Sequence, residues 1–308
     1  MLKEKEELKR LLEEGKIYIP LTNDSAFKSV LSQNPYYVID IVFKLFDIKE
    51  DIYKQNYYIR NSELIKKSKS EKLKRADLVF DIGGRVINLE MNSSYYKDVI
   101  KKNTRYLYRI IDGSLKEGKN YSSDNKMYVQ INFDNYDLFG KIISRFEFMD
   151  IKTKKTRKSY DKKINDPIIV HISLPLLLKK YYNKSKLSTL EKELLILGLM
   201  YKKEIKEVTK GNKLMEEVQS SMEKLTSDEE MRGIYLKEEQ ENWIRQCFKK
   251  DGFEDGIKEG IEQGIEKGRE EEKLTTAKNM LNDKVEISII SKYTGLSIEE
   301  IKNLNNYS

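Results

Sequence analysis

The chain has 308 residues and a net charge of +7 at pH 7, which is enough length for one substantial core and one or two smaller modules. It has no run of about eighteen apolar residues and no basic-then-apolar leader, so we expect a soluble cytoplasmic protein without a membrane partner. A single cysteine, Cys247, and a single histidine, His171, exclude an internal disulfide and a Cys/His zinc cluster, which leaves oxygen ligands for any metal ion.

The positive charge is unevenly distributed along the chain. Residues 222–272 hold 16 acidic and 9 basic side chains, a balance of −7, which leaves +14 on the rest of the chain. A surface with that surplus attracts polyanions at long range, and nucleic acid is the commonest polyanion in a cytoplasm. The charge pattern therefore favours a nucleic-acid partner.

The N-terminal part predicts helices followed by a strand. Residues 1–14 carry a partial leucine stripe typical of a packing helix, and residues 35–47 predict a second, apolar helix. A shorter helix between them begins with one of three candidate N-caps, namely Thr22, Asn23 or Asp24. Residues 52–59 are rich in tyrosine and predict a strand, and the Lys- and Ser-rich residues 62–74 predict a loop.

Residues 75–92 predict a β-hairpin. Apolar residues alternate from Leu78 to Ile82, a Gly83-Gly84 pair supplies the positive φ of a tight turn, and residues 86–91 form a second β-rich run. Asp77 and Glu90, thirteen positions apart, can therefore come close across the two strands.

Two carboxylates that lie close together repel each other, so a cation is expected between them. Each raises the pKa of the other unless a divalent cation lies between them, and Mg²⁺ prefers such oxygen ligands. Asp77 and Glu90 therefore predict a metal site. Asp81 is a further acidic candidate, which we expect to need a bulge or a twist before it faces the same ion as Asp77.

Helix and strand patterns alternate after the hairpin. Residues 95–118 predict a helix whose basic side chains form a solvated face or reach phosphate. Three further strands are predicted, at residues 127–133, 139–149 and 167–174. Apolar helices follow at residues 174–182 and 187–201.

Two features of this middle part leave alternatives open. Residues 152–163 hold seven Lys or Arg side chains in twelve positions and form a phosphate-gripping hairpin tip or a solvated loop. His171 lies between apolar neighbours, and we expect a satisfied core residue there rather than a base.

The C-terminal part is helical and repetitive. After a polar helical stretch at residues 218–250, glycine recurs every four residues from Gly252 to Gly268, and an apolar residue follows each of the first four. Because each glycine costs a helix about 1 kcal/mol relative to Ala, we expect close packing between protomers here, with a flexible charged linker as the alternative. Residues 274–304 predict a small helical tail for docking or oligomerisation, since Glu299 and Glu300 disfavour base reading.

The hairpin motif carries a family resemblance. Asp77 followed by Glu90-x-Asn92 resembles the core of the PD-(D/E)xK nucleases, in which an Asp and a Glu bind the metal ion and a Lys two positions on assists the attacking water. Three further segments are similar to the Rpn family of recombination-promoting nucleases, also described as transposases. They are Asp24-Ser25-Ala26-Phe27-Lys28, the Arg and Tyr residues at 105–108, and Gly118-x-x-Tyr121. That family often has Gln at the Lys position, where this chain has Asn92.

The resemblance implies a fold and a division of the chain. The fold class is α/β, with a restriction-endonuclease-like central mixed sheet flanked by helices and followed by an α-helical C-terminal region. The implied parts are a nuclease domain at residues 1–184, a helical region at 185–250, a glycine-repeat helix at 251–272 and a small helical tail at 273–308.

The resemblance also implies a DNA endonuclease that depends on Mg²⁺, with Mn²⁺ or Ca²⁺ as alternatives. Its catalytic residues would be Asp77, Glu90 and Asn92, and its metal ligands Asp77, Glu90 and Asp24 with the Met91 carbonyl. Asn92 would position the water or a phosphate oxygen. Nucleic acid would contact five basic residues, Lys28, Lys74, Arg75, Lys101 and Arg105, and the C-terminal helical region would form a homo-oligomer.

Two other function classes remain open at this point. Asn92 in place of Lys favours a catalytically weak or inactive nuclease fold that binds nucleic acid or a partner protein. The glycine repeat favours a structural or assembly protein built around that helix.

Overall fold

A computed structural model of the chain describes residues 2–60, 63–64, 74–75, 77–114, 126–160 and 165–305. At residues 2–5, 63–64, 74–75, 160, 242–260, 262 and 305 it describes the backbone alone. The chain forms two compact units, Met1–Leu236 and Lys237–Ser308. None of the described helices is long and apolar enough to cross a membrane.

A six-stranded mixed sheet forms the centre of the first unit, in the order β1-β4-β5-β6-β8-β7. Its strands are β1 (Tyr57–Arg60), β4 (Leu78–Ile82), β5 (Arg85–Asn92), β6 (Met127–Asp134), β7 (Ile143–Phe146) and β8 (Ile168–Ser173). Strands β5, β6 and β8 run parallel to one another, and the remaining pairs are antiparallel. A separate pair joins β2 (Glu63–Leu64) to β3 (Lys74–Arg75). The predicted α/β fold with a central mixed sheet is confirmed.

The predicted hairpin is the antiparallel pair β4–β5. Gly83 and Gly84 have φ angles of +52° and +80°, the left-handed conformations that a two-residue hairpin turn requires. The register pairs Leu78 with Leu89 and Ile82 with Arg85. Asp77, one residue before β4, therefore lies opposite Glu90.

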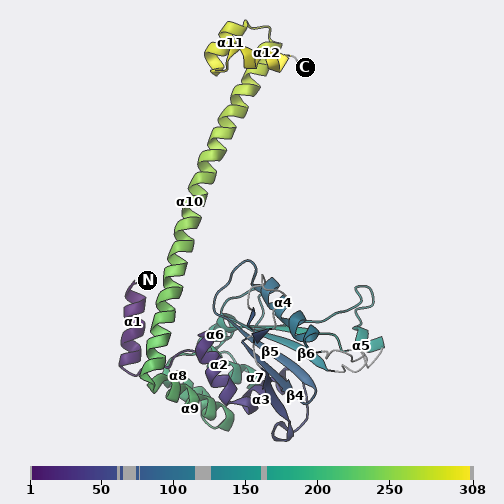
Figure 1. The fold of residues 1–308 in the computed structure, drawn as a ribbon, viewed down its shortest axis with the longest axis vertical. Coiled ribbons are helices and arrows are strands. Elements are labelled where there is room, and N and C mark those ends of the chain that lie inside the picture. Colours follow the sequence, from purple (N-terminus) through teal and green to yellow (C-terminus); the bar gives the residue numbers. More distant parts are fainter. Residues whose placement is uncertain are drawn as a thin grey trace. The chain divides into compact units, whose positions relative to one another are not determined.

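Helices cover both faces of this sheet (Figure 1). On one face, α2 (Asp24–Gln33) and α3 (Pro35–Leu45) pack on a large apolar core that includes Ile87, Leu89 and Phe133. On the other face, α4 (Val99–Asp112) covers a smaller apolar cluster, which consists of Val79, Val86, Leu107, Ile110 and Tyr128. Because strand residues alternate between faces, the side chains at positions 88, 90 and 92 lie on the α4 side.

Besides Tyr235, five further helices add buried side chains to the large core. They are α1 (Leu2–Glu13), α6 (Leu174–Tyr182), α7 (Thr189–Leu194), α8 (Lys202–Thr209) and α9 (Lys213–Ser227). A 3-10 turn, Leu195–Leu197, follows α7, so the predicted helix over residues 187–201 is shorter and divided. The four-part division of the chain stays a prediction.

Two of the predicted strands are shorter in the structure. Residues 52–54 form a 3-10 turn because the Asp51 side chain accepts a hydrogen bond from the Tyr53 N–H, and the strand begins only at Tyr57. Asp137 likewise accepts from the N–H groups of Phe139 and Gly140, and this turn delays β7 to Ile143. In both cases a local carboxylate competes with the strand for backbone donors.

The basic connector is a turn followed by a short helix. A bridge between Met149 and Thr156 closes the turn, and α5 (Arg157–Tyr160) follows. Residues 161–164 lie outside the described residues.

The last three helices are α10 (Glu229–Asn282), α11 (Ile287–Thr294) and α12 (Ile298–Asn305). The glycine repeat lies inside α10, in a continuous helix. Ala277, Ile290 and Ile301 form a small core in the tail, and Gly295, with φ of +74°, ends α11. The predicted α-helical C-terminal region is confirmed.

Candidate active site

The two acidic residues of the hairpin form a buried, hydrogen-bonded pair. The Asp77 N–H donates to Oε1 of Glu90 at 3.2 Å, and the Met91 N–H donates to Oδ2 of Asp77 at 2.8 Å. Asp77 is 7% exposed and Glu90 is 0% exposed. The hairpin register thus brings both carboxylates to one place on the α4 side of the sheet.

Glu90 is strongly perturbed by this environment. Burial, and then the neighbouring charge of Asp77, raise its pKa to about 8, although Lys102 acts in the opposite direction. Its Oε2 atom is buried and has no hydrogen-bond partner within the described part of the chain. An acceptor left open beside a second carboxylate fits the oxygen-rich coordination that Mg²⁺ or Mn²⁺ prefers.

Two lysines approach the pair from different helices. Nζ of Lys28 on α2 lies 3.0 Å from Oδ1 of Asp77, and Nζ of Lys102 on α4 lies 3.7 Å from Oε2 of Glu90. Burial lowers the pKa of Lys102, but the nearby charges, Glu90 first among them, outweigh this and raise it. Each carboxylate therefore has one ammonium group beside it.

Asn92 lies two positions after Glu90, and both ends of its side-chain amide are engaged. Its Nδ2 donates to Oδ1 of Asp134 at 2.8 Å, and its Oδ1 accepts from Nδ2 of Asn103 at 3.1 Å. The amide is 4% exposed. The residue at the Lys position of the motif is thus part of a buried network.

That network extends across three parallel strands. The register pairs Asn88 with Gln130, Glu90 with Asn132 and Asn92 with Asp134, and β8 adds His171 beside Asn132. We call these residues, together with Asn103 of α4, the polar ladder. Hydrogen bonds of 2.7–3.4 Å connect its members.

Most members of the polar ladder were not predicted from the sequence. The sequence nevertheless has a pattern that indicates them, because polar residues occupy every second position at 88, 90 and 92 and again at 130, 132 and 134. On a strand face that is covered by a helix, such alternation is unusual and indicates a polar site.

His171 is the satisfied buried residue that its apolar neighbours predicted. Its Nδ1 lies 2.7 Å from Oδ2 of Asp134, and the rings of Phe139 and Phe146 pack against the imidazole. It therefore belongs to the buried network rather than to an open cleft.

Two alternative roles are predicted for Asp24, as the N-cap of α2 or as a metal ligand. The structure excludes the first role. Asn23 is the N-cap, and its side chain accepts from the Ala26 N–H at 3.0 Å, whereas Asp24 is the exposed first residue of the helix. Within the described residues no three Asp, Glu, His or Cys side chains gather as a metal-binding group. The role of Asp24 as a metal ligand stays a prediction.

Asp81 needs no bulge to face the side of Asp77, which corrects the expectation. It pairs with Val86 and so lies on the α4 side. Its Oδ2, however, lies 2.8 Å from both Arg60 and Lys126. Burial raises the pKa of this carboxyl, but these two hydrogen bonds outweigh it and lower the pKa.

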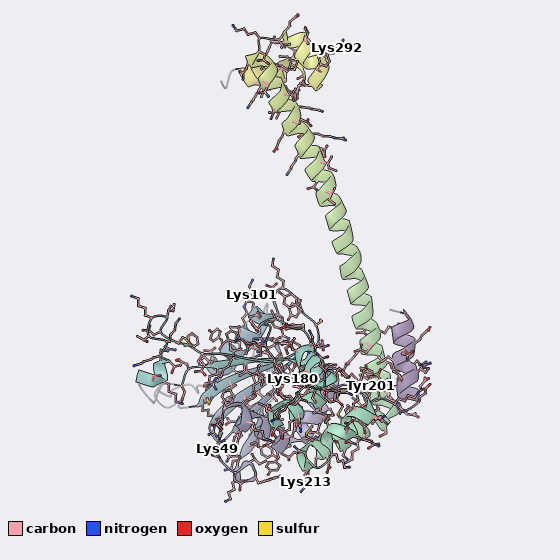
Figure 2. The ribbon with its side chains drawn as sticks, turned by 180° about the vertical axis from the view of Figure 1, so that it is seen from behind. Lys49, Lys101, Lys180, Tyr201, Lys213 and Lys292 are labelled. Carbon is pink, nitrogen blue, oxygen red and sulfur yellow. The ribbon has the colours of Figure 1, made fainter. Side chains whose placement is uncertain are left out.

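The remaining basic residues that were predicted to bind nucleic acid lie at the surface or outside the described part. Lys101 is exposed on α4 and pairs with Asp98 at 3.2 Å (Figure 2), and Arg105 is exposed one turn later. The backbone of Lys74 and Arg75 forms β3, but their side chains lie outside the described residues. The same holds for residues 65–73 and for Gly118-x-x-Tyr121.

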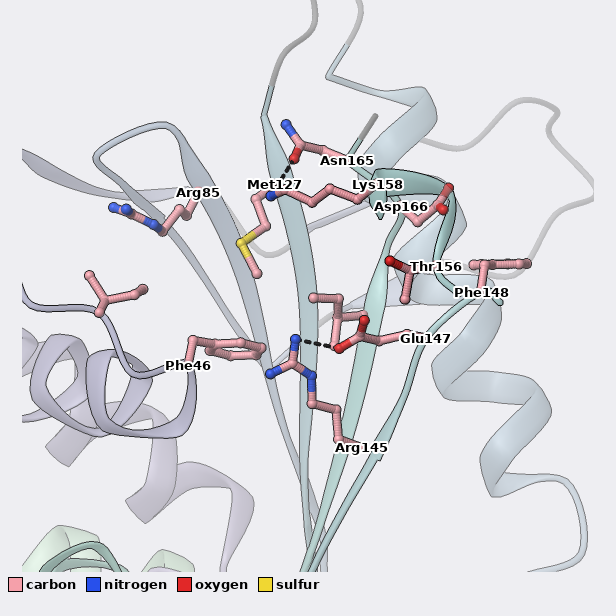
Figure 3. Close-up of a pocket in the computed structure, with 12 residues that line it drawn as sticks. Phe46, Arg85, Met127, Arg145, Glu147, Phe148, Thr156, Lys158, Asn165 and Asp166 are labelled. Carbon is pink, nitrogen blue, oxygen red and sulfur yellow. Dashed lines mark hydrogen bonds and ion pairs between the residues drawn. The ribbon is translucent and has the colours of Figure 1, made fainter. Parts of the chain in front are cut away.

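A pocket of about 330 Å³ lies at the other end of β5, β6 and β8, where Arg85, Met127 and Ile168 line it (Figure 3). Arg85 pairs with Glu50, and Arg145 pairs with Glu147. Two of the cations that line the pocket are therefore paired with carboxylates of the chain, and Arg85 lies five residues before Glu90 on β5.

A comparison with protein-family models places the site in a known context. The model described as PD-(D/E)XK nuclease family transposase matches residues 21–250. The matched range includes the carboxylate pair, both lysines and the whole polar ladder. Comparisons with curated proteins and with solved structures returned no match.

Proposed function

Because the chain belongs to the PD-(D/E)XK nuclease family of transposases, it is a nuclease-type protein, and we propose that it is a Mg²⁺-dependent DNA endonuclease of the recombination-promoting type. Nucleases of this superfamily generally use divalent metal ions. The observation that carries the proposal is the carboxylate pair, in which Glu90 is fully buried yet keeps one oxygen without a hydrogen-bond partner within the described residues.

The proposed ligands are Asp77 and Glu90, with Asp24 and the Met91 carbonyl as further oxygens. These oxygens would hold a divalent cation, which would lower the pKa of a bound water and neutralise charge that develops on the phosphate. Carboxylate oxygens favour Mg²⁺, with Mn²⁺ and Ca²⁺ as alternatives.

The other residues of the chain have supporting roles in this proposal. Lys28 lies beside Asp77, with its Nζ atom 3.0 Å from Oδ1, and holds this carboxylate in place. Asn92 is a positioning residue, since its amide is bonded to Asp134 and Asn103. Lys74, Arg75, Lys101 and Arg105 are the proposed contacts to the nucleic-acid backbone, which fix its register without reading sequence.

The test is cleavage of supercoiled plasmid DNA by the purified protein in Mg²⁺, in Mn²⁺ and in EDTA. We expect cleavage that the chelator stops, and loss of about 100-fold or more in Asp77→Asn and in Glu90→Gln, with an unchanged circular dichroism spectrum. Glu193→Gln is the matched control, because Glu193 is also a buried glutamate beside a lysine, Lys44, but lies on α7. Retained, chelator-sensitive cleavage in both site variants would contradict the proposed site.

A second function, binding without catalysis, is favoured by Asn92 at the position where the motif has Lys. A binding protein of this fold would hold DNA equally well in EDTA and in Mg²⁺, and its wild type would leave the plasmid intact. Fluorescence anisotropy with a labelled duplex, run beside the plasmid assay, distinguishes the two functions.

We also propose that the C-terminal helical region forms a homo-oligomer. Ile261 and Ile265 in α10 are 57% and 53% exposed, and they recur at the four-residue spacing of the glycines. A Cβ added at Gly264 or Gly268 would meet nothing within 4 Å. A second copy of the helix could therefore approach this stripe closely.

A further inference from the structure

The PD-(D/E)xK motif has a lysine two positions after its glutamate, and this chain has the uncharged Asn92 there. Asn92 carries no charge, it is buried, and its amide is bonded to Asp134 and Asn103. A side-chain cation at the scissile phosphate must therefore come from another element of the chain.

Helix α4 supplies the cation nearest to Glu90 among the described residues. Nζ of Lys102 lies 3.7 Å from Oε2 of Glu90, beyond hydrogen-bond distance, and 5.2 Å from the centre of the Tyr106 ring. Its side chain keeps 34% exposure, whereas Glu90 has none. The ammonium group is thus next to the buried carboxylate and still open to an anion from solution.

The polar ladder explains why Lys102 is there. Asn103, the next residue of α4, donates to Oδ1 of Asn92 at 3.1 Å and to Oδ1 of Asn132 at 2.8 Å. These two bonds fix the rotation and the height of α4 over β5 and β6. Asn92 consequently orients, through Asn103, the helix that carries the cation.

Lys28 is the other cation beside the pair, and its geometry differs. Its Nζ lies 3.0 Å from Oδ1 of Asp77, within hydrogen-bond distance, so its charge is already directed at that carboxylate. Lys102 makes no such close contact with Glu90, and it lies on the face of the sheet that carries Asn92.

We infer that Lys102 is a catalytic residue of this site, whose ammonium group contacts an oxygen of the scissile phosphate and supplies the positive charge that Asn92 does not. The inference rests on the proposed nuclease function. It assigns Lys102 an electrostatic role, and no proton transfer to or from Lys102 is required. Asn92 and Asn103 then act as positioning residues for it.

The test compares Lys102→Met, Lys102→Arg and the wild type in three measurements. These are the single-turnover rate of plasmid nicking in Mn²⁺, the affinity for Mn²⁺ alone by titration calorimetry, and the melting temperature. Lys180→Met is the matched control, because Lys180 (Figure 2) is 32% exposed and pairs with Glu191 at 2.7 Å, but lies on α6.

We expect Lys102→Met to nick DNA about 100-fold more slowly or worse, as for loss of one preorganised charge at a transition state. Its affinity for Mn²⁺ should stay equal or increase, because a positive charge beside Glu90 has been removed. Lys102→Arg should recover at least a tenth of the rate, and Lys180→Met should remain close to the wild type.

Two results would overturn the assignment of Lys102 alone. One is wild-type nicking by Lys102→Met, and the other is joint loss of Mn²⁺ binding and nicking, which would indicate a structural role. If the wild-type protein nicks no DNA in any divalent ion, the proposed function fails and the assignment fails with it.

Discussion

At the scale of a single residue, burial determines the protonation state of Glu90. A carboxylate with no exposure and a charged neighbour is expensive to ionise, which is why its pKa rises to about 8. The same residue type on the surface would be ionised throughout the physiological range. Burial thus keeps Glu90 protonated near neutral pH, even beside Lys102, unless a further cation favours its ionised form.

This perturbation makes the metal-free protein sensitive to pH. Because the pKa of Glu90 is higher in the folded protein than its ordinary value of 4.5, its stabilising contribution is present below pH 4.5 and is lost as the pH rises through about 8. We therefore expect the melting temperature in EDTA to fall by several degrees between pH 5 and pH 8. Differential scanning calorimetry measures this directly.

Glu90→Gln provides the control for that prediction, since glutamine does not titrate. Its melting temperature should depend less on pH over the same range and should exceed that of the wild type at pH 8. Equal pH dependence in the two proteins would show that another group is responsible.

At the scale of elements, helix α4 depends on polar contacts as well as on its apolar side. Leu107 and Ile110 pack on Val86 and Tyr128. Asn103 donates hydrogen bonds to the strand residues of the polar ladder. The apolar contacts alone allow several rotations of a helix on a sheet. Directional hydrogen bonds select one of them.

Asn103→Ala should therefore destabilise the protein by about 1–3 kcal/mol, because it removes two buried hydrogen bonds and leaves Oδ1 of Asn92 without its donor. Urea unfolding measures the free energy. Tyr108→Ala, at a 53% exposed position of the same helix, should change it by only about 0.5 kcal/mol. Equal stability of Asn103→Ala and the wild type would contradict the role of the ladder in docking α4.

At the scale of the whole molecule, charge and helix composition divide the chain. The acidic surplus lies in residues 222–272, and the basic surplus lies in the part that contains the carboxylate pair. This separation leaves the positive field on the part that we propose to bind DNA. The glycine-rich part of α10 is the part that we propose for contacts between copies.

Gly264→Leu tests those contacts in the full chain. Leucine is a better helix former than glycine by roughly 1 kcal/mol, and a Cβ added at this position meets nothing within 4 Å, so the single chain should not be destabilised. A close contact between two helices would, however, be blocked, and light scattering after size-exclusion chromatography should show a lower mass. Gly233→Leu, at an equally open glycine of α10 outside the repeat, is the control. A mass unchanged by Gly264→Leu would contradict self-association through this stripe.

The sequence by itself determined the hairpin and its carboxylate pair. Alternation with a period of two and a Gly-Gly turn are local signals, and the spacing of thirteen residues brings Asp77 opposite Glu90 once the turn is known. Local competition explains the error at residues 52–54, because the Asp51 side chain bends the start of a predicted strand. Asn23, one of the three predicted N-caps, is the residue that caps α2.

Only the tertiary structure decided which other side chains meet this pair. Strands β5, β6 and β8 are parallel, and each is joined to the next by a long crossover whose length does not determine the register. Their alignment, and with it the polar ladder, follows from packing across the sheet. The positions of Lys102 and Lys28 likewise depend on how two helices dock, which no spacing along the chain encodes.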